Sequence, residues 1–360
     1  RATVNFLTTH FGLERNIDNI WQILTIDRFY LDLRTKYIDF RLGKQSFEWG
    51  PAVIWNLTAP FNQQNALEPN AERPGLWGLN AYVGYSATGG FRLAVLAEPN
   101  IQISSEDILG AKAFVRWEQT FGETQIAATV LWSSVQKHMI FGAELKGQLG
   151  VGFWSELAGT VPYNVQPEER STRQNNIQVV VGIDYSLPIL DGFTFLLQYY
   201  YNHLGADQIA QYPSNTPSGR AQLNQTFQTL YQLSRTEASA QTNFNPGNFA
   251  GLGGGSSGFV AAHYFLGTAQ LTFLDDFQVS FFVLSNLVDP SMMVGPGFRA
   301  TFLSNFTFSF NAYFTIGPKN SEFQPGAREI RIRREDGSIL NTEVVYRASA
   351  TLLAQLRFNY

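Results

Sequence analysis

The sequence has no cysteine in 360 residues, which excludes disulfide bonds and thiolate metal sites. Charged residues are also few, at 15% of the chain with a formal net charge of −4 at pH 7, unlike the basic surface of a nucleic-acid-binding protein. No apolar run approaches the roughly 18 residues that a membrane-spanning helix needs. These absences argue against a disulfide scaffold, a nucleic-acid binder and a helical membrane protein.

Catalytic motifs are scarce as well. The histidines, His10, His138, His203 and His263, are scattered and lack the H-x-x-x-H or carboxylate spacing of a metal site. There is no G-x-S-x-G nucleophile elbow. The glycine-rich stretch that starts at Gly251 lacks the lysine of a phosphate-binding loop. We therefore expect a protein that is not an enzyme and that uses no cofactor and no metal.

What the sequence does contain is alternation of apolar and polar residues. In residues 346–360, apolar side chains from Tyr346 to Tyr360 occupy every second position, and polar ones such as Arg347 and Arg357 lie between them. A period of two indicates a β-strand with one apolar and one wet face. Such a long strand that ends on an aromatic residue resembles the C-terminal signal that the barrel-assembly machinery reads in bacterial outer-membrane proteins.

Similar alternation recurs along the chain and predicts about sixteen strands of a transmembrane β-barrel. Aromatic residues make up 14% of the sequence, which suits the aromatic girdles of such a barrel. We expect strands at residues 4–13, 21–34, 37–50, 77–86, 91–97, 110–120, 124–133, 139–148, 152–160, 177–187, 193–202, 259–273, 277–286, 298–303, 306–316 and 346–360. Residues 288–296 are expected to be a loop.

The connections between these strands alternate in length. Short turns follow the even strands and long loops follow most odd ones, and in barrels of this class the short turns face the periplasm. We therefore predict an all-β fold, a single transmembrane antiparallel barrel over residues 1–360 in the bacterial outer membrane, with both termini periplasmic and the export signal already removed. The long extracellular loops are expected at about 51–75, 161–175, 205–258 and 317–341.

Charged residues on the faces opposite the apolar ones are expected to line the lumen. Arg or Lys on the lipid face would cost about 2–4 kcal/mol at the bilayer midplane. The predicted pore-lining residues are Arg28, Asp32, Arg34, Asp39, Arg41, Arg92, Lys112, Arg116, Glu118, Glu144, Lys146, Asp184, Arg299, Arg347 and Arg357, and Glu156 lies on the same set of faces. Barrels of about sixteen to eighteen strands hold an aqueous channel, and Arg and Lys rings favour anions. Mutual pairing in a salt-bridge ladder is the alternative.

The residues Arg-Phe-Tyr-Leu-Asp-Leu-Arg at 28–34 and Tyr-Ile-Asp-Phe-Arg-Leu-Gly-Lys-Gln-Ser-Phe-Glu-Trp-Gly at 37–50 form a recurring pattern. It resembles outer-membrane porin-like families, including the alginate-export type and related uncharacterised porin families. The resemblance covers about 25 residues and implies an outer-membrane barrel. The segment that follows, residues 51–62, is apolar for an external loop; it either folds into the barrel, by analogy, or packs on the rim.

Two loops carry further signals. Within residues 205–258, Leu223, Phe227 and Leu230 share one helical face, which predicts an amphipathic helix that caps or plugs the lumen, with a disordered exterior loop as the alternative. The arginines of residues 328–334 precede an Asp-Gly turn, which predicts a β-hairpin. Its charges either touch lipopolysaccharide phosphates or a partner, or form a solvated face.

These patterns favour a passive outer-membrane channel for small polar or anionic solutes, with Arg28, Arg41, Arg116 and Arg357 among the side chains that set its field. A structural or scaffold barrel, plugged by its loops and anchoring envelope partners, is the alternative, and a specific importer or exporter is a third. The expected partners are outer-membrane lipids and lipopolysaccharide, the barrel-assembly machinery, small polar solutes, and a possible homo-oligomer or envelope protein partner, with no nucleic acid.

Deletion of residues 222–238 should raise the single-channel conductance, because the predicted helix would no longer obstruct the lumen. Planar-bilayer recordings of the intact and deleted chains measure this. Equal conductance would remove the plug hypothesis.

Overall fold

The computed structural model describes residues 2–11, 24–47, 49–60, 75–98, 110–134, 136–165, 174–212, 260–302, 306–318, 321–323, 328–333, 339–345 and 350–358. The strands are β1 (Ala2–Phe11), β2 (Leu24–Arg34), β3 (Asp39–Gln45), β4 (Leu76–Ser86), β5 (Gly89–Glu98), β6 (Gly110–Phe121), β7 (Thr124–Ser133), β8 (His138–Leu149), β9 (Val151–Pro162), β10 (Asn176–Leu187), β11 (Gly192–Asn202), β12 (His263–Phe273), β13 (Phe277–Asn286), β14 (Ser291–Phe302), β15 (Phe306–Ile316), β16 (Arg328–Arg333), β17 (Ile339–Val345) and β18 (Ala350–Phe358). The described residues also include a short 3₁₀ turn, η4 (Ile209–Gln211).

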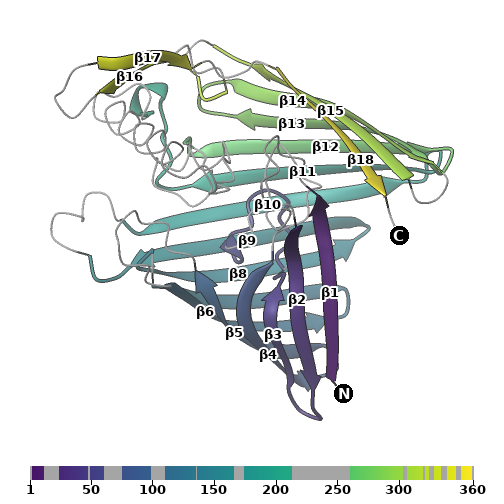
Figure 1. Ribbon diagram of the computed structural model, residues 1–360. Coiled ribbons are helices and arrows are strands. Elements are labelled where there is room, and N and C mark those ends of the chain that lie inside the picture. The colour runs from purple at the N-terminus through teal and green to yellow at the C-terminus, as the bar shows by residue number, and fades with distance from the viewer. Residues whose placement is uncertain are drawn as a thin grey trace. The chain divides into compact units, whose positions relative to one another are not determined.

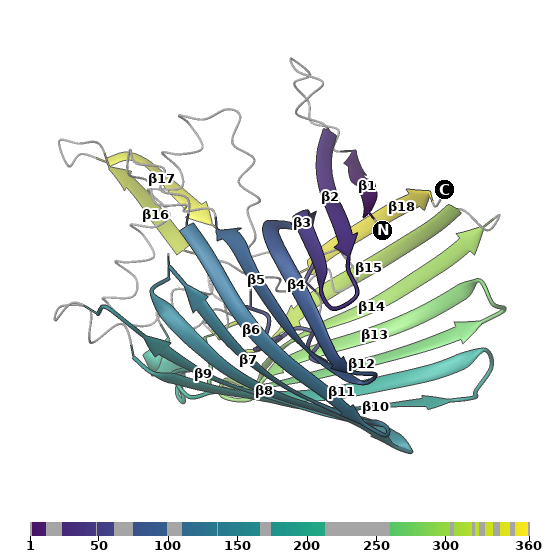
Figure 2. The same cartoon turned by 90° about the horizontal axis from the view of Figure 1, so that it is seen from below.

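Sixteen strands follow one another in sequence order, β1 to β15 and then β18, and β16 pairs with β17 in a separate hairpin. The chain divides into two compact units, Arg1–Val180 and Val181–Tyr360, with the boundary inside β10. In the first unit, β1 to β9 form an antiparallel meander, most of which is labelled in Figure 2. In the second, β11 to β15 and then β18 do the same (Figure 1). The predicted all-β antiparallel fold is therefore confirmed.

The two faces of these strands are reversed relative to a water-soluble protein. Along β7, the apolar Ile126, Val130 and Trp132 are exposed, whereas Thr129 and Ser133 are buried. The same exposure of large apolar side chains recurs on β2, β4, β5, β8, β9 and β10. An apolar surface that extends over so many strands suits a lipid environment, and the polar residues then lie on the opposite face. We call that opposite face the polar face.

Aromatic rings gather near two tight turns of the second unit. Phe273 and Phe277 flank the turn between β12 and β13, and their ring centroids are 5.7 Å apart. Phe277 also contacts Phe298 and Phe302, and Phe302 contacts Phe306 across the turn between β14 and β15. Such a cluster at the strand ends is typical of the aromatic girdle at a membrane interface.

The predicted strand order is confirmed, but several boundaries are corrected. Residues 288–296 were expected to be a loop and 298–303 a strand, whereas β14 runs from Ser291 to Phe302. Pro296 and its two flanking glycines give this stretch the composition of a loop, because proline has no backbone N–H to donate to a neighbouring strand. Pro296 pairs with Phe281 on β13, whereas the pairing of β14 with β15 skips from Val294 to Gly297.

Other boundaries shift by a few residues. The third strand is shorter than predicted, Asp39–Gln45, and the twelfth begins at His263 instead of residue 259. The last strand is Ala350–Phe358, and the remainder of its predicted span lies outside the described residues. The predicted hairpin is present, with Arg331 paired with Thr342. The predicted plug helix lies outside the described residues. Within the part that is described, no helix is long and apolar enough to cross a membrane.

A charge on the exposed apolar face should be costly. Val130→Arg should lower the free energy of unfolding by about 2–4 kcal/mol if that position lies near the bilayer midplane, and Leu149→Arg, at the β8–β9 turn, by about 0–1 kcal/mol. Denaturant unfolding in phospholipid vesicles measures both. Equal losses for the two variants would contradict a lipid-facing position for Val130.

Candidate functional site

A hollow of about 500 Å³ lies on the polar face of the first unit. We call it the arginine hollow. It is lined by Arg28, Tyr30, Arg41, Ser46, Phe47, Trp49, Gly50, Pro51, Asn80, Arg92, Arg116, Glu118, Gln125, Ala127, Glu144 and Lys146. Seven of these are predicted pore-lining residues, and among the seven are five basic and two acidic side chains. The sheet therefore brings together seven residues that the alternation of apolar and polar positions had placed on the same kind of face.

Arg41 on β3 is held by a carboxylate and by an aromatic ring. Its Nε and Nη2 atoms donate to the two oxygens of Asp32, at 2.6 and 3.1 Å. Its guanidinium carbon lies 4.1 Å from the centre of the Tyr30 ring. A bidentate pair and a stacked ring fix the plane of the guanidinium group.

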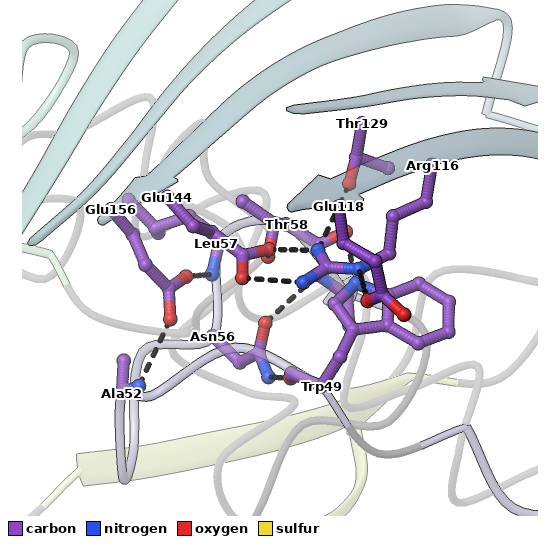
Figure 3. Close-up of polar contacts among 11 residues, drawn as sticks. Trp49, Ala52, Asn56, Leu57, Thr58, Arg116, Glu118, Thr129, Glu144 and Glu156 are labelled. Atoms are coloured by element: carbon purple, nitrogen blue, oxygen red, sulfur yellow. Dashed lines mark hydrogen bonds and ion pairs between the residues drawn. The ribbon is translucent and has the colours of Figure 1, made fainter. Parts of the chain in front are cut away.

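Arg116 on β6 is the most deeply buried cation of the hollow, with only 2% of its side chain exposed. Its two terminal nitrogens donate to both oxygens of Glu144, one of them at 2.9 Å, and its Nε donates to Glu118 at 3.2 Å. Nη1 also donates to Thr129 at 3.3 Å. The ring of Trp49 covers the guanidinium group at 5.4 Å (Figure 3). The positive charge of Arg116 is therefore compensated by two carboxylates, and its other contacts are with a hydroxyl and an aromatic ring.

Arg92 and Lys146 differ from these paired cations. Arg92 on β5 lies directly opposite Arg116 in the sheet register and stacks on Tyr82 at 5.2 Å. In the described part of the chain, neither Arg92 nor Lys146 has a carboxylate within ion-pair distance. Arg41 and Arg116 thus show the predicted ion pairing, whereas Arg92 and Lys146 stand apart from it.

The segment after β3 folds back on itself, and we call residues 49–60 the strap. Asn56 joins its two ends, because its Nδ2 donates to the carbonyl of Trp49 and its Oδ1 accepts from the amide of Ala59 at 2.8 Å. Gly50 has φ +84°, and an added Cβ would lie 2.8–2.9 Å from the side chains of Asn56 and Glu156. Only glycine fits that position without displacement.

The strap packs on the polar face of β8 and β9. Both oxygens of Glu156 accept backbone N–H groups from it, Ala52 at 2.9 Å and Leu57 at 2.8 Å, and the Thr58 hydroxyl donates to Glu144 (Figure 3). Glu144 and Glu156 lie in the middle of their strands, away from the turns. Of the two predicted positions for this loop, these contacts support folding inward and not packing on the rim.

None of the other predicted residues is among the described residues that line the hollow. Asp32 is buried behind Arg41, and Arg34 and Asp39 face each other, exposed, at the β2–β3 turn. Lys112 is half-buried near the start of β6. Asp184 and Arg299 belong to the second unit, Arg347 is outside the described residues, and of Arg357 only the backbone in β18 is described.

A second polar cluster lies within the second unit, where β12, β13 and β14 meet their connecting loops. The Asn286 amide donates to Glu322 at 2.7 Å and to the Tyr212 hydroxyl at 2.8 Å, and the Tyr264 hydroxyl donates to Glu322. Burial raises the pKa of the Tyr212 hydroxyl, and the Asp289 and Glu322 carboxylates raise it further. The Tyr212 hydroxyl therefore stays protonated. Through Asn286 the cluster joins Tyr212, at the start of one long connection, to Glu322 in another.

The neutral members of the hollow did not stand out in the sequence. Tyr30 shares the parity of Arg28 on its strand, and Asn80 alternates with apolar neighbours on a strand without charged residues, so the period of two would have placed both on the polar face. The same alternation covers Tyr82 and Thr129, which contact Arg92 and Arg116. Trp49 also has the parity of Arg41 within the predicted strand 37–50, although the observed β3 ends at Gln45. Among the described residues, no group of three or more His, Cys, Asp or Glu side chains is placed to hold a metal ion.

No protein-family model matches the sequence, and no curated protein sequence matches it. Solved structures do match. Wzi of Escherichia coli, an outer-membrane protein involved in group 1 capsule assembly and a carbohydrate-binding β-barrel, is 10% identical, with a TM-score of 0.52 over 94% of this chain and 71% of Wzi.

Two proteins of Pseudomonas aeruginosa match similarly. OccK11 (OpdR) is 11% identical, with a TM-score of 0.50 over 82% of this chain and 76% of its own. OccK8 (OprE) is 7% identical, with a TM-score of 0.50 over 80% of this chain and 75% of its own. At such identities the likeness shows the fold alone, which is that of an outer-membrane β-barrel. The resemblance to the alginate-export type stays a prediction.

Breaking the buried pair at the hollow should destabilise the protein. Arg116→Met should cost about 3–5 kcal/mol of unfolding free energy, because it leaves Glu144 buried without its cation. The double variant Arg116→Met/Glu144→Gln should lose less than the sum of the single losses. Asp32→Asn, in a pair whose arginine is 34% exposed, should cost about 1 kcal/mol or less. Additive losses in the double variant would contradict a coupled pair.

Proposed function

We propose that the protein is an outer-membrane channel through which small polar or anionic solutes diffuse passively. The observation that carries this proposal is the arginine hollow, where five basic and two acidic side chains gather on the face opposite the exposed apolar surface. A closed barrel of about sixteen strands is wide enough to hold water. Basic groups along such a pathway lower the energy of an anion that has shed part of its hydration shell.

Four of the five cations that line the hollow fall into two groups. Arg41 pairs with one carboxylate and Arg116 with two, so both shape the wall and add little positive field. Arg92 and Lys146 supply positive charge without a described carboxylate partner. This geometry favours Arg92 and Lys146 over Arg41 and Arg116 as the residues that set the field. The sequence had pointed to Arg28, Arg41, Arg116 and Arg357.

The second candidate is a scaffold barrel that its own loops plug. The strap favours it, because a buried segment on the polar face reduces the space for solutes. In either function the protein would lie among outer-membrane lipids and lipopolysaccharide after insertion by the barrel-assembly machinery. Envelope partners and a homo-oligomer belong to the scaffold alternative in particular.

Planar-bilayer recordings distinguish the two candidates. The channel should give steady ion current, and its reversal potential in a salt gradient should have the sign of anion preference, because the hollow carries excess positive charge. Arg92→Gln/Lys146→Gln should reduce that preference. A silent protein that co-purifies with envelope proteins would support the scaffold instead.

The matched control is Asp32→Asn/Arg41→Gln, which removes one positive and one negative charge from the same wall. Because the net charge is conserved, its reversal potential should stay close to that of the unmodified protein. If this control shifts the potential as much as Arg92→Gln/Lys146→Gln does, the assignment of the field to Arg92 and Lys146 is wrong.

A further inference from the structure

The strap is attached to the sheet through side chains. The hydrogen bonds from Ala52, Leu57 and Thr58 to β8 and β9 end on the carboxylates of Glu156 and Glu144. A strand in a sheet is held by its backbone along its whole length, so no single substitution releases it. Two of the hydrogen bonds that attach the strap to the sheet end on one side chain, Glu156.

The strap is also a folded unit in its own right. Asn56 closes it from within, and the Trp49 indole donates to the carbonyl of Thr58 at 3.3 Å. Its buried side chains are Ala52, Ile54, Trp55, Asn56, Leu57, Thr58 and Ala59. These internal bonds do not involve Glu156, so a substitution of Glu156 does not remove them.

The first residues of the strap form part of the wall of the arginine hollow. Trp49, Gly50 and Pro51 all line it, and Trp49 covers Arg116. Whether the strap is docked therefore decides how wide the hollow is and which face of Arg116 meets water.

We propose that docking of the strap on the polar face narrows the solute pathway, and that Glu156 is the positioning residue that keeps it docked. This inference rests on the proposed channel function and adds the element that sets its width. Glu156 has no exposed surface, and its two oxygens accept the backbone N–H groups of Ala52 and Leu57. A carboxylate is the only side chain of this size that offers two acceptors and no donor.

Glu156→Gln tests the proposal with almost no change of volume. The amide keeps one acceptor and turns a donor toward the other N–H, so one bond is lost and one donor is left unsatisfied. Single-channel conductance should rise. Hydrogen exchange at the amides of Ala52 and Leu57 should become faster by about tenfold or more, as expected for the loss of a hydrogen bond to a charged acceptor.

A reversible lock gives a second test. A Cβ built on Gly142 lies 3.4 Å from the Cβ of Thr58, close to the spacing in a disulfide, and the chain has no other cysteine. In Glu156→Gln/Thr58→Cys/Gly142→Cys, oxidation should return the conductance to that of the unmodified protein and reduction should raise it again. Glu123→Gln, in an exposed turn, is the control for the lost charge and should change neither current nor exchange.

The outcomes separate this inference from the channel proposal. If the unmodified protein conducts and Glu156→Gln conducts equally while exchange is faster, the strap does not narrow the pathway and only this inference fails. If exchange is unchanged, Glu156 does not hold the strap and the inference also fails. A silent protein that begins to conduct on Glu156→Gln supports the strap and overturns the open channel. Silence of both overturns both. A heat-modifiable, folded band on electrophoresis is required of every variant.

Discussion

Two buried carboxylates face each other across β8 and β9, and the site is arranged around this constraint. Glu144 and Glu156 are direct partners in the sheet register, and like charges so placed repel each other. Each is compensated differently: Glu144 by Arg116 and the Thr58 hydroxyl, Glu156 by two backbone N–H groups. The strap therefore contributes to the electrostatic balance of the sheet, because without it the Glu156 carboxylate would have to accept its hydrogen bonds from water.

The fold was largely predictable because each strand has to separate two media. Alternation over β7 and β15 is dictated by the strand period, and the structure keeps the predicted bounds there within a residue. The prediction failed at β14, where Pro296 and its glycines resemble a loop in sequence but lie inside a strand. Proline is therefore an unreliable sign of the end of a strand when the neighbouring strand needs no hydrogen bond from that position.

The site was only half predictable. Which charged residues share the polar face follows from parity, but which of them are paired depends on cross-strand neighbours. Arg116 meets Glu144 from 28 residues away, and the strap meets Glu156 from about a hundred, so no local pattern contains these contacts. The strap itself looked only like an apolar loop, and both of its predicted positions were compatible with the sequence.

Compensation of Arg116 also explains how Arg92 keeps its charge. The two arginines are direct partners across β5 and β6, where two uncompensated cations would be unfavourable. Because Glu144 and Glu118 lie against Arg116 and compensate its positive charge, Arg116 opposes the charge of Arg92 less. Glu144 thus has two tasks: it accepts the strap through Thr58, and it removes the repulsion that would otherwise oppose a free cation beside it. Glu144 therefore contributes both to the contacts of the strap and to the charge balance of the hollow.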